Sequence, residues 1–223
     1  MEIGIVGLPN VGKSTLFNAL TGAAAAASNF PFTTIDPNVG VVPLADERLT
    51  KLGEMFKSEK VTPAGIKFVD IAGLVKGASQ GEGLGNKFLS HIRAVDAIAH
   101  VVRCFKDPDV VNVLGQLNPA EAADIIETEL LLADLQQAEK ALDKMHGPAR
   151  SGDKKAKEKL EMMQGLVQGF KEGKSARVQN IPADVQAEQG FLTGKPILYV
   201  ANGDETGSDA AMLAALKARA RIE

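Results

Sequence analysis

The sequence lacks the features that hold a secreted or membrane-bound protein together. Its one cysteine, Cys104, excludes an internal disulfide and a cysteine-rich zinc site. No apolar run is long enough to span a bilayer, and the first residues lead into a strand pattern instead of a signal peptide. We therefore expect a cytoplasmic protein without a membrane partner, and we expect Cys104 to be buried at a strand end.

Aromatic residues and excess charge are also scarce. Of 223 residues, 4% are aromatic and 45% are hydrophobic, so the core must be aliphatic, as suits a parallel sheet covered by helices. The formal net charge of -3 argues against a generally basic nucleic-acid-binding surface, although it leaves a local patch open. We therefore expect no sequence-specific DNA partner. The length allows one large domain, or one domain with a smaller one inserted.

A phosphate-binding motif is present at Gly7 to Ser14, with the sequence GLPNVGKS. It fits the P-loop pattern G-x-x-x-x-G-K-[ST], which a chain of this composition contains by chance roughly once in a hundred sequences. An apolar run, residues 2–6, precedes it, and a helical pattern, residues 15–20, follows it. Strand, glycine-rich loop and helix stand in the order that the motif requires.

The chemistry of this motif follows from its residue types. Gly7 and Gly12 let the backbone turn tightly and approach phosphate oxygens, while N–H groups at the helix N-terminus point at the anion. Lys13 can reach the outer phosphates, and Ser14 offers a hydroxyl ligand for Mg²⁺. The alternative is a glycine-rich turn that only caps a helix, but such a turn needs neither Lys13 nor Ser14.

The segment after the first helix is the expected place of a metal-binding threonine. Gly22 favours a break before the five alanines that follow, although these alanines can also extend the helix. Residues 29–38 contain two prolines and cannot be a helix interior. In P-loop NTPases a threonine here completes the Mg²⁺ shell, so Thr34 or Thr33 is a candidate. The alternative is an ordinary polar loop.

A second chemical element lies at residues 66–73, IKFVDIAG. An apolar strand that ends in aspartate and is followed by glycine is typical of a Walker B strand, so Asp70 is predicted to hold Mg²⁺ through water and the Gly73 N–H to meet the γ-phosphate. Leu74 stands where Ras-like GTPases place the glutamine that orients water, and leucine cannot polarise water. Hydrolysis is therefore slow, or a group that the sequence does not identify does this work.

The rest of the chain predicts a nucleotide-binding domain with an inserted helical hairpin. Strands are expected at 39–42, 97–102 and 195–201, and helices at 46–56, 87–93 and 210–221. From Pro119 two apolar seams flank a polar break at 147–153, which predicts an antiparallel coiled-coil hairpin. Its lysine-rich face is expected to be solvated; the alternative is a dedicated partner-binding site. The predicted domains are 1–118 with 191–223, and 119–190. The seams consist of Leu131, Leu135, Ala138, Leu142 and Met145, then Ala156, Leu160, Met163, Val167 and Phe170.

The base-binding segment departs from the guanine-specific pattern N-K-x-D. The chain has Asn202, lacks the lysine at Gly203, and has Glu205 where the aspartate would stand. That aspartate accepts hydrogen bonds from guanine N1–H and from the 2-amino group, whereas adenine lacks the 2-amino donor. The altered signature weakens the case for GTP without proving ATP.

Several motifs together resemble the Obg-like ATPases of the YchF type, within the translation-factor class of P-loop GTPases. They are GLPNVGKST, NFPFTTIDPN, DIAGLVKGAS with GEGLGNKFLSHIR, and NGDE. The resemblance implies a three-layer α/β P-loop fold with a mostly parallel sheet and an inserted coiled-coil hairpin. It also implies a Mg²⁺-dependent ATPase that prefers ATP over GTP and associates with the ribosome, the large subunit being the expected partner. Family members carry a C-terminal TGS domain, and this chain ends before it.

The resemblance also carries site residues. It implies that Ser14 and Thr34 bind the metal, in addition to Asp70 from the Walker B pattern. Lys13 and Gly73, which the motifs place at the outer phosphates, are the predicted catalytic residues. We expect slow ATP hydrolysis; the alternatives are a GTPase switch and a nucleotide-dependent binding module with negligible turnover. The residues expected to bind nucleotide are Asn10, Val11, Gly12, Lys13, Ser14 and Thr15 for the phosphates, and Asn202, Gly203 and Glu205 for the base.

Overall fold

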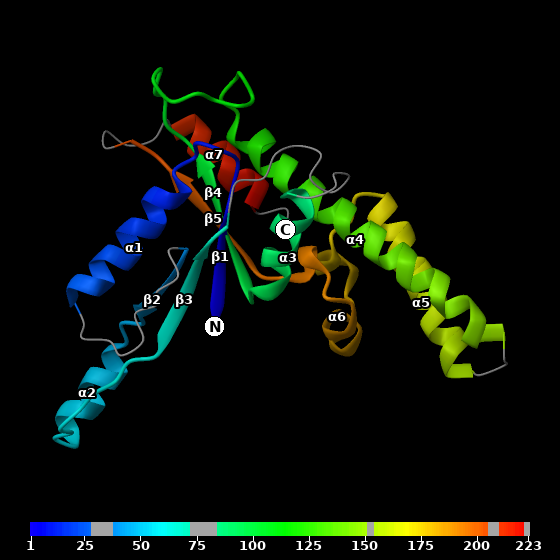
Figure 1. The fold of residues 1–223 in the computed structure, drawn as a ribbon, viewed down its shortest axis with the longest axis horizontal. Helices are drawn as coiled ribbons and strands as arrows, with labels where there is room; N and C mark the ends of the chain where they lie inside the picture. The colour runs from blue at the N-terminus through cyan, green and yellow to red at the C-terminus, as the bar shows by residue number, and fades with distance from the viewer. Residues whose placement is uncertain (28–37, 72–83, 151–153, 205–209, 221–223) are drawn as a thin grey trace.

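A five-stranded sheet forms the centre of the computed structural model, which describes residues 1–27, 38–71, 84–150, 154–204 and 210–220. The strand order is β2-β3-β1-β4-β5 (Figure 1). β2 runs antiparallel to β3, and the other neighbours are parallel, which confirms the predicted α/β fold with a mostly parallel sheet. The strands are β1 (Glu2–Val6), β2 (Val39–Pro43), β3 (Gly65–Asp70), β4 (Ala97–Arg103) and β5 (Ile197–Asn202).

The order of the strands brings the predicted motifs to one edge of the sheet. All seven residues of β4 are buried, as expected for an inner strand covered on both faces. β1 lies between β3 and β4, and Ile5 is in register with Asp70. Because parallel strands end at the same edge, the glycine-rich loop after β1 lies beside Asp70 at the end of β3.

Helices flank the sheet. α1 packs against β1, β2 and β3, α4 packs against β4, and α7 packs against β5 and α4. The main core joins strand residues to helix residues such as Phe17, Ile92 and Ile126. The helices are α1 (Lys13–Ala27), α2 (Glu47–Met55), α3 (Leu84–Ala94), α4 (Pro119–Arg150), α5 (Lys154–Lys171), α6 (Ala183–Gln189) and α7 (Ala210–Ala220), with short 3₁₀ segments η1 (Ala176–Gln179) and η2 (Leu192–Gly194). None of the described helices is long and apolar enough to cross a membrane.

α1 continues through Gly22, so the predicted break at this glycine is wrong. A glycine inside a helix costs only about 1 kcal/mol relative to alanine. The alanines that follow are the strongest helix formers, and they outweigh this local cost. The prediction for Cys104 is confirmed, because its side chain is fully buried just after β4.

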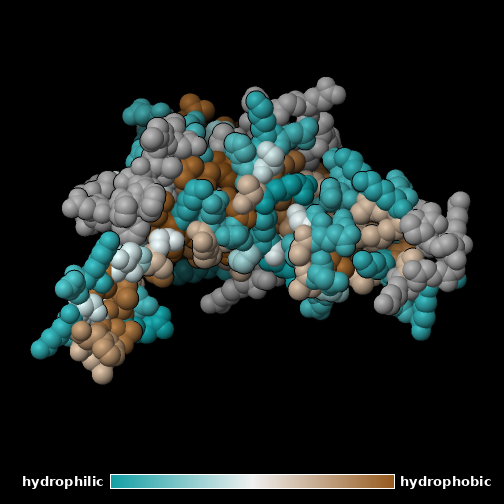
Figure 2. Space-filling view, turned by 60° about the horizontal axis from the view of Figure 1, so that its bottom comes forward, coloured by the Kyte–Doolittle hydropathy of each residue, from teal (hydrophilic) through white to brown (hydrophobic). Residues whose placement is uncertain are grey.

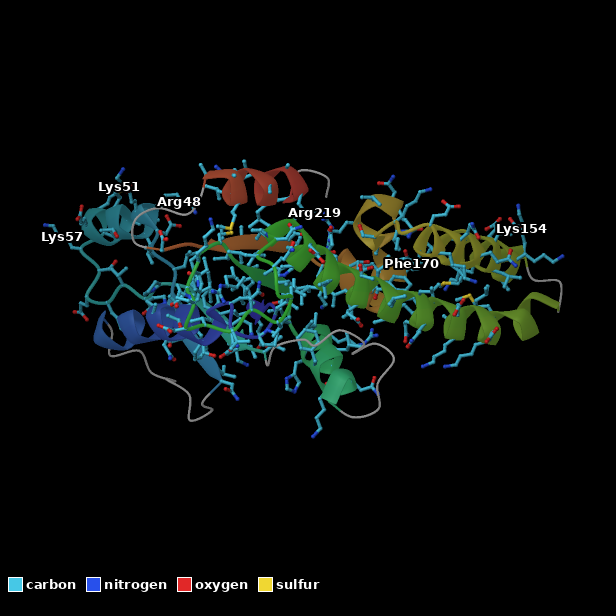
Figure 3. All side chains as sticks on the ribbon, turned by 90° about the horizontal axis from the view of Figure 1, so that it is seen from above. Arg48, Lys51, Lys57, Lys154, Phe170 and Arg219 are labelled. Carbon is cyan, nitrogen blue, oxygen red and sulfur yellow. The ribbon has the colours of Figure 1, made fainter. Side chains whose placement is uncertain are left out.

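A second apolar cluster lies away from the sheet, in a unit that we call the arm (residues 138–150 and 154–191). The first half of α4 belongs to the main core through Ile126 and Leu130, and α5 runs back along the second half of α4 (Figure 1). Figure 3 shows Phe170 inside the arm and Lys154 near its far end. The domain boundary at residue 119 and the coiled-coil geometry stay predictions. The buried members of the arm cluster are Ala138, Met163, Leu166, Val167, Phe170, Ala176, Val185 and Phe191.

α2 projects from the opposite end of the molecule. Asp46 caps it by accepting a hydrogen bond from the Arg48 backbone N–H at 2.9 Å, in agreement with the predicted start. α2 has no buried residue, and Met55 and the following Phe56 are mostly exposed. Figure 2 shows a hydrophobic surface at this end, and Figure 3 shows that Arg48, Lys51 and Lys57 extend from the same region.

Candidate nucleotide-binding site

The glycine-rich loop joins β1 to α1 in a conformation that depends on two glycines. A Cβ at Gly7 would lie 2.5 Å from the carbonyl oxygen of Val101, so the loop approaches β4 too closely for any side chain. Gly12 has a φ of 93°, and a Cβ there would collide with the side-chain amide of Asn202. Asn10 is also in the left-handed region, with a φ of 61°, which asparagine tolerates better than most residues. The two glycines therefore let the loop pack closely against β4 and against the Asn202 side chain.

Lys13, Ser14 and Asp70 meet at this edge of the sheet. The Lys13 Nζ donates a hydrogen bond to the Leu8 carbonyl oxygen at 3.0 Å, so the side chain curls over the loop. Burial lowers the pKa of Lys13, and the nearby Asp70 carboxylate opposes this shift. The Ser14 hydroxyl donates to Asp70 Oδ2 at 2.7 Å, across 56 residues of sequence. The fold thus brings the two predicted metal-binding side chains into direct contact.

The Asp70 carboxylate fits a divalent cation. Its Oδ1 atom is buried, and no hydrogen-bond donor reaches it from the described residues. A buried carboxylate oxygen without a partner is costly unless a cation or a bound water satisfies it. A cavity of about 480 Å³ opens at this point, within the range of ligand sites; Lys13, Ser14 and Asp70 contribute to its wall, as does His91 from α3.

Two asparagine side chains connect the loop to its surroundings, Asn202 from the end of β5 and Asn10 from within the loop itself. The Asn202 side chain, at the end of β5, donates from Nδ2 to the Val11 carbonyl oxygen at 2.9 Å. The Asn10 side chain donates from Nδ2 to the Val111 carbonyl oxygen at 3.2 Å, in the segment that follows β4. Consecutive loop residues are therefore held by β5 and by the segment after β4.

The remaining predicted residues divide into described and undescribed ones. Thr15 is exposed in the first turn of α1, and Gly203 directly follows Asn202 at the end of β5. The base-binding roles of Asn202 and Gly203 stay predictions, because the described contacts of Asn202 are to the loop. Thr33, Thr34, Gly73, Leu74 and Glu205 lie outside the described residues.

Sequence reasoning missed Arg103, which organises the segment after β4. Its side chain is 6% exposed, and its guanidinium donates to the carbonyl oxygens of Phe105, Asp107 and Val110. The available signal was a single arginine at the end of a strand whose other residues, apart from His100, are apolar. Within the segment after β4, the Asp109 N–H also donates to Asp107 Oδ1 at 2.9 Å.

The family described as "50S ribosome-binding GTPase" matches residues 2–142, which is more than half of the chain. The chain belongs to this family. The part that matches this ribosome-binding GTPase family includes the glycine-rich loop, Asp70 and most of α4.

Individual relatives place the chain more closely within the 50S ribosome-binding GTPase family. It is 55% identical over 209 residues to the ribosome-binding ATPase YchF of Pasteurella multocida (strain Pm70), and these residues cover 92% of this chain and 58% of that protein. It is 51% identical over 208 residues to the protein of that name from Bacillus subtilis (strain 168), covering 92% and 57%. The solved structure of the Schizosaccharomyces pombe YchF GTPase matches with a TM-score of 0.82 and 36% identity, covering 100% of this chain and 62% of that one.

These matches confirm the resemblance to the YchF type that the motifs indicated. The chain spans 57–58% of the length of the two curated relatives.

Proposed function

We propose that the chain binds ATP with Mg²⁺ and hydrolyses the ATP slowly, as a cytoplasmic P-loop switch that associates with the ribosome. The observation that carries the proposal is the convergence of Lys13, Ser14 and Asp70, where Asp70 Oδ1 is buried without a partner. The names of the bacterial relatives, which describe ribosome-binding ATPases, support both the activity and the partner.

The residues of the loop would bind the β- and γ-phosphates. Backbone N–H groups at the N-terminus of α1 would donate to the anion, and their partial positive charge would complement it. The Lys13 ammonium would exchange the Leu8 carbonyl oxygen, now 3.0 Å away, for a phosphate oxygen. A nearby phosphate would also oppose the lowering of the Lys13 pKa by burial and keep the side chain charged. These groups stabilise the charge that develops on the phosphates during hydrolysis.

Mg²⁺ fits the polar groups at the end of β3. Ser14 Oγ would be a direct ligand and Asp70 would hold the ion through water, with Thr34 as the proposed third contributor. When bound, the ion would supply positive charge to the β- and γ-phosphate oxygens. Gly73, through its backbone N–H, is the proposed sensor of the γ-phosphate.

The proposed preference for ATP rests on the segment after β5. The guanine-reading lysine and aspartate are replaced by Gly203 and Glu205. A GTPase is the second candidate. It is supported by the descriptions of the matching family and of the Schizosaccharomyces pombe relative of solved structure, both of which name a GTPase. We propose the large ribosomal subunit as the partner, because the family description names 50S ribosome binding.

Calorimetry with Mg²⁺ tests the base preference. ATP and GTP are titrated into the native chain and into the double variant Gly203→Lys with Glu205→Asp. We expect the native chain to bind ATP at least tenfold more tightly, a difference of about 1.4 kcal/mol, and the double variant to lose this preference. Tighter binding of GTP by the native chain would refute the assignment of adenine.

A phosphate-release assay on the same samples tests turnover. We expect slow release of phosphate from ATP that depends on Mg²⁺. Tight ATP binding without any release over the lifetime of the sample would identify a nucleotide-dependent binding module instead of an enzyme.

A further inference from the structure

Arg103 ends β4 with its charge almost completely withdrawn from water. Its Nε donates to the Phe105 carbonyl oxygen at 3.1 Å, its Nη2 to that of Asp107 at 3.0 Å, and its Nη1 to that of Val110 at 2.8 Å. The guanidinium carbon also lies 4.4 Å from the centre of the Phe105 ring. Three backbone carbonyls and one aromatic face therefore compensate a buried cation, and residues 105–110 are wrapped around it.

The segment that Arg103 shapes continues directly to the phosphate-binding loop. Val110, whose carbonyl accepts from Arg103, precedes Val111, whose carbonyl accepts from the Asn10 side chain at 3.2 Å. Beyond this point Asn112 closes the segment, because its Nδ2 donates to the Gln116 carbonyl oxygen at 2.8 Å. The Val111 carbonyl that Asn10 binds thus lies between Val110, which Arg103 holds, and Asn112, whose own side chain binds Gln116.

The backbone conformation of Asn10 explains why its side-chain hydrogen bond to Val111 matters. Asn10 is one of only three described non-glycine residues with a positive φ, so its backbone conformation is intrinsically disfavoured. The hydrogen bond to Val111 is the described contact of its side chain, and the next residue, Val11, is held from the other side by Asn202. The loop therefore depends on the segment after β4 at Asn10 and on β5 at Val11.

We propose that Arg103 is a positioning residue for nucleotide binding, which acts through the Val111 carbonyl on Asn10 and thereby on the phosphate-binding loop. The geometry requires arginine. Three separate donors in one plane reach three carbonyl oxygens, and the guanidinium carbon lies over the Phe105 ring; lysine has neither the fork nor the flat face. The inference rests on the proposed nucleotide binding and adds to it a residue outside every motif of the site.

A double-mutant cycle on ATP affinity with Mg²⁺ tests the proposal. The variants are Arg103→Lys, which keeps the charge and loses the fork, Asn10→Gly, which accepts the positive φ and loses the side-chain donor, and their combination. We expect each single change to weaken ATP binding by about fivefold and the double variant to remain near that value, because both changes break one connection. Independent effects would multiply to about 25-fold, and that result would overturn the proposal.

A matched control separates positioning from general stability. Arg177 is another largely buried arginine; it donates to the Lys195 carbonyl oxygen at 3.1 Å and to Glu127 at 2.9 Å, and both of these contacts lie away from the loop. We expect Arg177→Lys to lower the melting temperature and leave ATP affinity unchanged. If Arg103→Lys behaves in the same way, Arg103 is a structural residue only and the proposal is wrong.

Two further measurements keep the outcome decisive. If Arg103→Lys does not fold, Phe105→Leu removes the adjacent ring and keeps the fork of donors. We then expect a smaller loss of ATP affinity, which again does not multiply with the loss caused by Asn10→Gly.

Nucleotide binding by the native chain distinguishes failure of the proposed function from failure of the proposed role of Arg103. A native chain that binds neither ATP nor GTP refutes the proposed function and this inference together, whereas a native chain that binds, with variants that bind equally well, refutes this inference alone.

Discussion

The phosphate-binding edge and the arm are built from opposite kinds of contact. At the phosphate-binding edge, polar groups from segments far apart in sequence meet at short distances, as in the contacts of Ser14 with Asp70 and of Asn202 with Val11. In the arm, apolar side chains such as Phe170 and Phe191 form the cluster, and the charged side chains lie outside it. The Lys171–Glu139 pair, 2.9 Å apart, is about half exposed.

This difference predicts that the two regions fail in different ways. A change at the phosphate-binding edge removes an interaction with ligand and leaves the apolar core intact. A change in the arm cluster removes buried surface and leaves the ligand site intact. The main link between them is α4, which contributes Leu130 to the sheet core and Ala138 to the arm core.

Lys13→Ala should have the largest effect on nucleotide binding. Loss of a buried cation that meets phosphate costs about 4 kcal/mol, which corresponds to a reduction in ATP affinity of about a thousandfold. The melting temperature without nucleotide should hardly change, because burial already disfavours the charged form of this lysine and lowers its pKa. Calorimetry and thermal unfolding measure both quantities.

The matched control for Lys13→Ala is Lys171→Ala. It removes the same side chain from a half-exposed ion pair in the arm, which contributes at most about 1 kcal/mol to stability. ATP affinity should remain at the native value. An equal loss of affinity in both variants would show that the two regions do not behave separately.

Phe170→Ala should destabilise the arm and spare the nucleotide site. Phe170 is 2% exposed, and its ring packs edge-on against Phe191 with the centroids 5.1 Å apart. Truncation should lower the free energy of unfolding by about 3 kcal/mol, measured by urea denaturation, with unchanged ATP affinity in the folded protein.

Phe56→Ala serves as the control for this truncation, because Phe56 is 69% exposed at the end of α2. The same atoms are removed without a buried cavity, so the free energy of unfolding should stay within about 0.5 kcal/mol of the native value. Equal losses at Phe170 and Phe56 would contradict the burial argument.

The sequence allowed correct prediction of those parts in which local pattern and fold agree. Apolar runs identified the strands of the sheet, and the seam of α5 contains Met163, Val167 and Phe170, which are buried in the arm cluster. The motifs pointed to Lys13, Ser14 and Asp70, which the fold brings together. Such predictions succeed because the periodicity of burial and the spacing of a phosphate-binding loop are local properties of a chain.

What could not be predicted depends on contacts between distant segments. Asp134 is fully buried in α4 and accepts hydrogen bonds from the Leu192 and Thr193 backbone N–H groups at 2.7 and 2.8 Å, 58 and 59 residues away. Arg103 donates to backbone carbonyl oxygens, which every residue type has, so no side-chain pattern in the sequence indicates its partners. The predicted break at Gly22 failed for the opposite reason. The local preference of this glycine for a helix end was outweighed by the helix-forming residues around it, and α1 continues.

The smallest expected effect concerns pH and β4, inside the sheet that carries the site. His100 is fully buried beside the Tyr199 ring, and burial, aided by the positive charge of Arg219, lowers its pKa from 6.5 to about 3. The unfolded chain therefore binds a proton below pH 6.5 that the folded chain refuses until about pH 3, so stability is complete above 6.5 and falls as the pH drops through this window. Between pH 7 and 5.5 this histidine should remove about 1 kcal/mol from the free energy of unfolding.

Urea titrations of His100→Leu at the two pH values should lack this decrease. Replacement of the exposed His91 of α3 by leucine is the control and should retain it. An unchanged pH dependence in His100→Leu would assign the acid sensitivity to other groups.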